Sequence, residues 1–339
     1  MKQAWIKSAT FDSIWILAPG LIPVLLLFIF PSIFIEQSSE ISPFYWVVLI
    51  LLIDVAHVHS SLYRTYFNPL ARKKFSTLFK AVPFISWLVG VLLYSISSIV
   101  FWRCLAYLAV FHFIRQQYGF LKIYSRNETL SGWVTKIQTT TIYAVTFIPI
   151  CIWHVTGPKN FNWFVEGDFF YLDSPTLGLV LKVIFFLVII TYFVSELYVL
   201  IKCKTYNIPR LFLVVGTAAS WYIGIVLFNG DLSFTALNVI SHGIPYMALV
   251  WVSEKKQAST GNSKFLKLIF SYYGVLLFVG LVVLFAYIEE GLWDALVWRE
   301  REGVFHYFYF LKPLKNIRLF SLVVPFLALP QIVHYVLDG

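Results

Sequence analysis

The sequence predicts an all-α, polytopic integral membrane protein, a single helix bundle of about ten transmembrane helices within a range of 8–10. Of the 339 residues, 59% are hydrophobic and only 13% are charged, which is too few charges to cover a soluble surface of this size. Apolar runs recur along the whole length, and each is long enough to cross a hydrocarbon core of about 30 Å. We therefore expect one transmembrane domain over residues 1–339.

Ten apolar segments are predicted to span the membrane. Their ranges are 14–35, 43–63, 81–102, 104–124, 133–155, 177–201, 210–228, 234–252, 265–287 and 317–337. The third and fourth segments are divided only around Arg103, so a single re-entrant element is an alternative to two crossings. Residues 288–316 mix acidic, basic and aromatic side chains, which predicts an interfacial amphipathic loop.

The basic residues are scattered through short loops. When the spans alternate in direction, most of the lysines and arginines fall in loops on the side of the N-terminus. Because lysine and arginine favour cytoplasmic loops, both termini are predicted to be cytoplasmic. The membrane is expected to be a bacterial inner (plasma) membrane. The formal charge of +9 is then explained by topology, and no nucleic-acid partner is expected.

The second span carries a group of polar residues inside an apolar run. Asp54, His57 and Ser61 are spaced i, i+3 and i+7, so they share one face of a helix. His59 lies two positions from His57, about 200° around a regular helix, and points elsewhere. Ionisable groups at this depth are costly unless paired or bound, so they mark a candidate functional site.

Three further spans repeat this arrangement of a histidine with polar residues at helical spacing. The eighth span also contains Pro245, which frees a backbone carbonyl one turn earlier and loosens the helix beside the histidine. The polar groups are, span by span, His112, Arg115, Gln116 and Gly119; Asn238, His242 and Tyr246; and Gln331, His334 and Asp338.

Imidazoles from several helices, with carboxylates behind them, are the donor set of a non-haem iron, copper or zinc site. A carboxylate that accepts one ring N–H fixes the tautomer in which the other nitrogen binds the metal, and Asp54 and Asp338 fit that role. A structural zinc site is not expected, because no thiolates accompany the histidines. The predicted metal ligands are His57, His59, His112, His242 and His334, and the other predicted site residues are Asp54, Arg115, Gln116, Tyr246 and Asp338.

Each of these residues also has a structural interpretation. A single histidine within a membrane is more often an interhelical hydrogen-bonding group than a metal ligand. Arg115 can serve as a structural counter-ion to Asp54 or as a phosphate anchor, and Arg64 can extend to the membrane interface.

The bundle with histidine-bearing helices at Asp54, His57 and His59, at His112, at His242 and at His334 resembles the Brp/Blh family of bacterial carotene dioxygenases. In that family, histidines from several helices hold a non-haem iron that cleaves a polyene to retinal. The resemblance implies Fe²⁺ as the cofactor, with another transition metal as the alternative, and a carotenoid or another lipid as the substrate.

Three functions agree with these patterns. The leading hypothesis is a membrane-embedded, iron-dependent oxygenase or oxidase that acts on an apolar or amphiphilic small molecule entering from the lipid bilayer. The second is a proton-coupled transporter that uses the same Asp, His and Arg groups. The third is a lipid-modifying transferase with a histidine general base.

Overall fold

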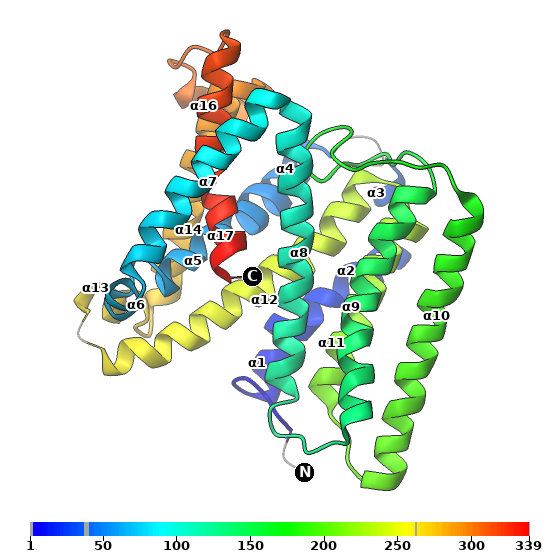
Figure 1. Ribbon diagram of the computed structural model, residues 1–339. Helices are drawn as coiled ribbons and strands as arrows, with labels where there is room; N and C mark the ends of the chain where they lie inside the picture. The colour runs from blue at the N-terminus through cyan, green and yellow to red at the C-terminus, as the bar shows by residue number, and fades with distance from the viewer. Residues whose placement is uncertain (1–2, 37–40, 262, 339) are drawn as a thin grey trace. The chain divides into compact units, whose positions relative to one another are not determined.

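The computed structural model describes residues 3–36, 41–261 and 263–338, and every regular element within these ranges is a helix. The all-α prediction is therefore confirmed for this part of the chain. The helices group into two compact units (Figure 1), one formed by Met1–Ile41 and Val110–Pro245, the other by Ser42–Ala109 and Tyr246–Gly339. Two long helices, α8 (Ser98–Tyr124) and α12 (Asp231–Thr260), contain residues of both units.

The first unit is built on three long helices, with α10 and α11 each packed against α9. Their bounds are α9 (Gly132–Val155), α10 (Pro175–Tyr198) and α11 (Ile208–Tyr222). The N-terminal segment packs on α11, where Ser220 Oγ donates a hydrogen bond of 2.8 Å to the Gly20 carbonyl. The remaining elements are α1 (Ala9–Asp12), η1 (Ser13–Leu17), η2 (Ala18–Gly20), α2 (Ile22–Ile29), α3 (Pro31–Glu36), η4 (Val199–Cys203) and η5 (Ile223–Leu227).

A buried cluster of charges ties three segments of the first unit together. The guanidinium of Arg210, at the start of α11, is fully buried and donates to the carboxylates of both Glu128 and Glu196. Asn207, which caps α11, donates to the Tyr124 carbonyl at 2.8 Å and to Glu128 at 2.9 Å. The buried charge of Arg210 is therefore compensated by two carboxylates whose side chains are only 12% and 13% exposed.

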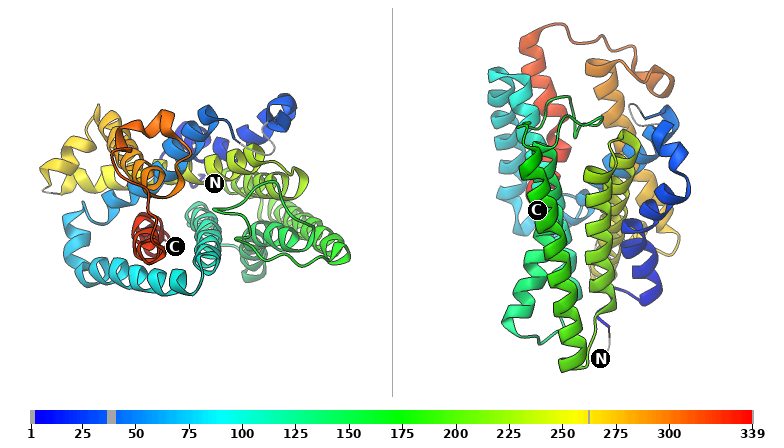
Figure 2. Two further views of the ribbon diagram at one scale, coloured as in Figure 1. Left: turned by 90° about the horizontal axis from the view of Figure 1, so that it is seen from above. Right: turned by 90° about the vertical axis from the view of Figure 1, so that its right-hand side faces the viewer.

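The second unit is centred on helix α5 (Ala56–Arg64), which packs against α14 (Gly274–Trp293) and α17 (Leu329–Asp338). Figure 2 shows in both views that α7 (Ser76–Ile96) lies beside α16 (Ile317–Leu327) and α17. A Cβ at Gly90 on α7 would lie 2.7 Å from Pro325 on α16, so these helices need glycine there. The other elements are α4 (Pro43–Trp46), η3 (Val47–Val55), α6 (Pro69–Lys74), α13 (Lys264–Ile269), η6 (Asp294–Trp298), α15 (Glu302–Phe305) and η7 (His306–Phe308).

Seven helices in the described part of the chain are long and apolar enough to cross a membrane. Two bent pairs, Ala9–Gly20 with Ile22–Ile29 and Ile317–Leu327 with Leu329–Asp338, raise the number to nine if each pair is one span. These helices suggest a membrane protein. Helix α9 occupies the predicted span 133–155 but is not among them, since its first half carries Lys136, Gln138 and several threonines.

Two boundaries differ from the prediction. The third and fourth spans are separate helices, but the break is at Ser97, which has an extended backbone, and the expected divider Arg103 lies inside α8. Serines near this break offer the backbone local hydrogen bonds that compete with a helix. A hydropathy pattern instead places the division at Arg103, because this residue is charged and the serines are not.

The predicted ninth span, 265–287, is divided by a turn. A Cβ at Gly274 would overlap the carbonyl of Ile269, so this close approach requires glycine, and it separates α13 from α14. The spanning helix therefore starts later than expected and runs on to Trp298. The first part of the segment 288–316 is the end of this helix, and the remainder contains α15 and η7.

Replacing Arg210 with methionine is expected to destabilise the first unit strongly, because Glu128 and Glu196 would keep buried charges without compensation. The expected loss is about 3–5 kcal/mol of unfolding free energy. Thermal unfolding of the purified chain in detergent measures it, with Lys136→Met, an exposed cation of the same unit, as the control. Equal midpoints for both variants would contradict a structural role of the cluster.

Candidate metal centre

Helix α5 places two histidines in different surroundings. His57 Nδ1 lies 3.7 Å from Oδ1 of Asp54, one turn earlier. His59 Nε2 lies 2.9 Å from Oε2 of Glu289 on α14, and its ring is 5.7 Å from that of Phe285. The two imidazoles therefore face different neighbours, as their spacing of two residues predicts.

Helix α17 brings a second imidazole to His57. His334 is fully buried, and its ring centroid lies 5.1 Å from that of His57 and 4.9 Å from that of Tyr246. Asp338, one turn later, has a carboxylate oxygen 3.3 Å from His334 Nδ1. The same carboxylate accepts a 2.6 Å hydrogen bond from the Tyr246 hydroxyl and pairs with Arg64 at 3.1 Å.

Helix α12 carries His242 one turn before Tyr246, so the two side chains share one face of this helix. In the first unit, Phe113 stacks on the His242 ring with centroids 3.5 Å apart, and the His112 centroid lies 5.2 Å away. Gln116 donates a 2.9 Å hydrogen bond to the His242 carbonyl. The aromatic stack and the amide together fix both the ring and the backbone of His242.

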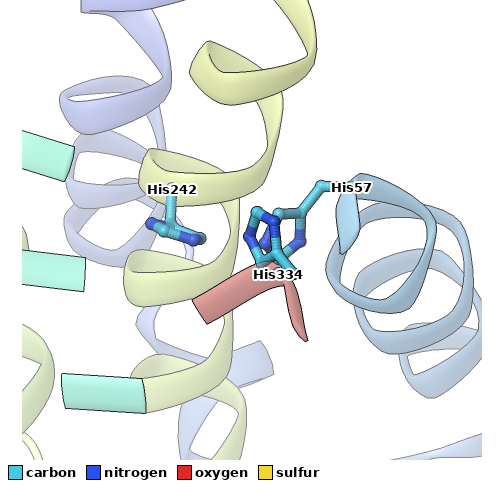
Figure 3. A group of neighbouring side chains, drawn as sticks. All are labelled: His57, His242 and His334. Atoms are coloured by element: carbon cyan, nitrogen blue, oxygen red, sulfur yellow. The ribbon is translucent and has the colours of Figure 1, made fainter. Parts of the chain in front are cut away.

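Three of the predicted ligands form one group. His57, His242 and His334 come from α5, α12 and α17, and Figure 3 shows their side chains as neighbours. One ring nitrogen from each lies within 4.8 Å of the other two, and all three residues are buried. Within the ranges that the structure describes, no other set of three or more His, Cys, Asp or Glu residues meets this condition.

The donor set of this group fits a transition metal. Neutral imidazole binds iron, copper, nickel and zinc, and three imidazoles leave coordination positions for a small molecule. The carboxylates of Asp54 and Asp338 lie on the Nδ1 side of His57 and His334. A carboxylate in that place favours the tautomer with the proton on Nδ1, in which Nε2 carries the ligand lone pair.

The remaining predicted site residues lie outside the group of three. His112 neighbours His242, whereas His59 is paired with Glu289. Arg115 donates to the Tyr143 hydroxyl at 2.8 Å and lies over the Tyr118 ring. Asn238, also expected near the site, donates to the Phe234 carbonyl of its own helix at 2.8 Å.

Sequence reasoning missed buried acids of the second unit, among them Glu289 and Glu254. The sequence predicts a loop at Glu289, but α14 carries this residue beside His59. Its position four residues after Phe285, whose ring also faces His59, is the helical spacing that indicates a shared face. Glu254 on α12 accepts a 3.1 Å hydrogen bond from Asn68. Two lysines follow Glu254 in the sequence, so it resembles an ordinary surface acid. No local pattern indicates that it is buried.

Comparison with known proteins adds no relative: no protein-family model, no curated protein and no solved structure matches the chain.

Metal titration tests the group of three. Cobalt(II) added to the purified chain after metal removal is expected to bind at about one ion per chain and to give the visible absorption of a low-coordinate nitrogen site. His334→Ala should abolish that absorption, and Asp338→Asn should weaken binding about 10–100-fold. His59→Ala is the matched control, because its ring faces Glu289, and it should bind cobalt as the parent chain does. Equal binding by the His334 and His59 variants would contradict the assignment.

Proposed function

We propose that the chain is an integral membrane metalloenzyme that holds a transition metal through His57, His242 and His334 and oxidises an apolar, lipid-like substrate. The observation that supports this most strongly is the group of three buried imidazoles, with ring nitrogens within 4.8 Å, on helices of a strongly apolar chain. Ionisable groups that converge inside a membrane mark a candidate functional site, because they are costly there unless paired or bound. His112, beside His242, is the candidate for a fourth ligand.

Non-haem iron as Fe²⁺ is the metal that we propose. Imidazole ligands without thiolates suit iron, copper, nickel or zinc, and iron is the metal that pairs such ligands with open positions in oxygenases. When bound, the iron would supply the activation of dioxygen, which the side chains present cannot perform. Another transition metal remains the alternative within the same proposal.

The chain's own residues would orient the ligands and exclude water. Asp338 holds the Nδ1 side of His334 and is itself held by Tyr246 and Arg64. Asp54 lies on the Nδ1 side of His57 at 3.7 Å, which is beyond hydrogen-bond distance. Phe113, stacked on His242, prevents that ring from rotating and shields it from water. An oxidation with a short-lived reactive species requires such a dry and rigid setting.

A lipid-like substrate agrees with the surface of the chain. Large apolar side chains are exposed along several helices, including Leu92 and Ile96 on α7 at 65% and 74%. Such surfaces are stable only in contact with lipid or with another apolar molecule. A substrate soluble in the bilayer would reach the helices without first passing through water.

Oxygen consumption and metal content provide the test. The purified chain should contain about one iron per chain and should consume dioxygen when a carotenoid or another unsaturated lipid is supplied. His242→Ala should lose both properties, whereas His154→Ala, which changes a histidine outside the group of three, should keep both. Full activity without metal would refute the proposal. It would favour a proton-coupled carrier if proton flux accompanied transport, or a transferase if one histidine sufficed.

We further propose that both termini lie on the cytoplasmic side of a bacterial inner membrane. Helix α9 decides this, because the two bent pairs and the seven long helices give an odd number of crossings, and α9 makes the number even. Reporter domains fused separately to each end should both be active only in the cytoplasm. Activity of the two reporters on opposite sides would show that α9 does not cross.

A further inference from the structure

We propose that one end of the second unit is a binding surface for the headgroups of anionic phospholipids. This surface, called here the basic surface, consists of α6, the start of α7, the last turns of α12 and α13. Its cations are Arg72, Lys73, Lys74, Lys80, Lys255, Lys256, Lys264 and Lys267. The inference rests on the proposed membrane location but not on the metal.

Side-chain contacts hold these distant segments together. Asn68 caps α6 by accepting from the backbone N–H groups of Leu70 and Ala71 at 3.0 and 3.2 Å. Its amide donates to Glu254 and Gln257 on α12 at 3.1 and 3.0 Å. The cap of α6 is therefore fastened directly to the last turns of α12.

A ring contact attaches the second short helix. Phe67, just before the cap residue Asn68, lies edge-on to Phe265 of α13 with centroids 5.4 Å apart. Tyr66 also donates a 2.7 Å hydrogen bond to the Phe79 carbonyl of α7. The basic surface is thus one supported face of the second unit, although its parts lie almost two hundred residues apart in the sequence.

The positive charge of this face is not neutralised by protein. All eight cations are exposed, and none forms an ion pair with another residue in the part of the chain that the structure describes. The sole carboxylate in segments 62–80 and 247–273 is Glu254, which is 2% exposed and bound by Asn68. Clusters of about four to eight such cations next to apolar helices are typical sites for anionic lipid headgroups.

Exposed apolar side chains lie among these cations. Helix α13 buries Leu266 and Ile269 and exposes Phe265 and Leu268, so it has one face for the protein and another for a second apolar phase. Leu70 on α6 is 69% exposed between the cap and Arg72. Cations mixed with exposed leucine and phenylalanine fit the boundary between headgroups and acyl chains. A soluble polyanion would match the charges but would leave the apolar side chains in water.

Lipid binding by the purified full-length chain tests the proposal. Native mass spectrometry in detergent should show at least tenfold tighter binding of phosphatidylglycerol than of phosphatidylcholine with the same acyl chains. Lys73→Gln, Lys74→Gln, Lys256→Gln and Lys264→Gln together should reduce the difference to about twofold. The control changes the same number of exposed lysines in the first unit or in the part of α8 that belongs to it, Lys122, Lys136, Lys202 and Lys204, to glutamine, and should keep the preference.

Three results would overturn the proposal. They are no preference in the parent chain, an equal loss in both quadruple variants, and binding of inorganic phosphate or polyglutamate as tight as that of phosphatidylglycerol. If the test variant fails to fold, the parent chain still decides the question, because added salt should weaken its binding of phosphatidylglycerol but not of phosphatidylcholine. Metal content measured on the same samples separates the two proposals, since lipid preference without metal contradicts only the metal centre.

Discussion

The carboxylate of Asp338 is the interaction on which the packing of the second unit depends. Its side chain is only 4% exposed, yet it joins three helices, because Tyr246 of α12 and Arg64 of α5 both bind it beside His334 of α17. A carboxylate in an apolar interior is stable only when charges and hydrogen bonds surround it in this way. The orientation of His334 toward His57 follows from this arrangement.

The same rule governs the other buried ionisable groups. His59 is paired with Glu289 in the second unit, and Arg210 is held between two glutamates in the first. Glu289 lies on α14 and Glu196 on α10, whereas Glu128 lies in the segment between α8 and α9, so burial of charge fixes how segments pack as well as which side chains meet. His59, whose ring is paired with Glu289, lies outside the group of three. The basic surface is the opposite case, because its charges are exposed and form no ion pair within the described ranges of the chain.

Much of the fold could be predicted from the sequence, because long apolar runs leave few alternatives to helices. The errors fall where local geometry opposes composition: the break lies at Ser97 rather than Arg103, and the close approach of Gly274 to Ile269 shifts the start of α14. The helix also continues past its predicted end at residue 287, so Glu289 lies on it, beside the buried His59, and not in the expected loop. A window of hydropathy cannot detect such a turn, since the residues on both sides of it are apolar.

The candidate site was predictable in its pairs but not in its assembly. Helical spacing indicates that Asp338 accompanies His334 and that Asp54 accompanies His57, and both pairs are present. Which imidazoles converge depends on tertiary packing, for which one sequence without relatives contains no direct signal. The substrate, the metal and the resemblance to carotene dioxygenases remain proposals that rest on chemistry.

X-ray absorption at the metal edge of the purified chain tests the central claim most directly. The account predicts a first shell of nitrogen and oxygen only, with the outer-shell scattering of about three imidazole rings and metal–nitrogen distances of about 2.0–2.1 Å. His59→Ala should leave that spectrum unchanged. Sulfur in the first shell, or a shell of oxygen atoms without imidazole scattering, would contradict the assignment of His57, His242 and His334 as ligands.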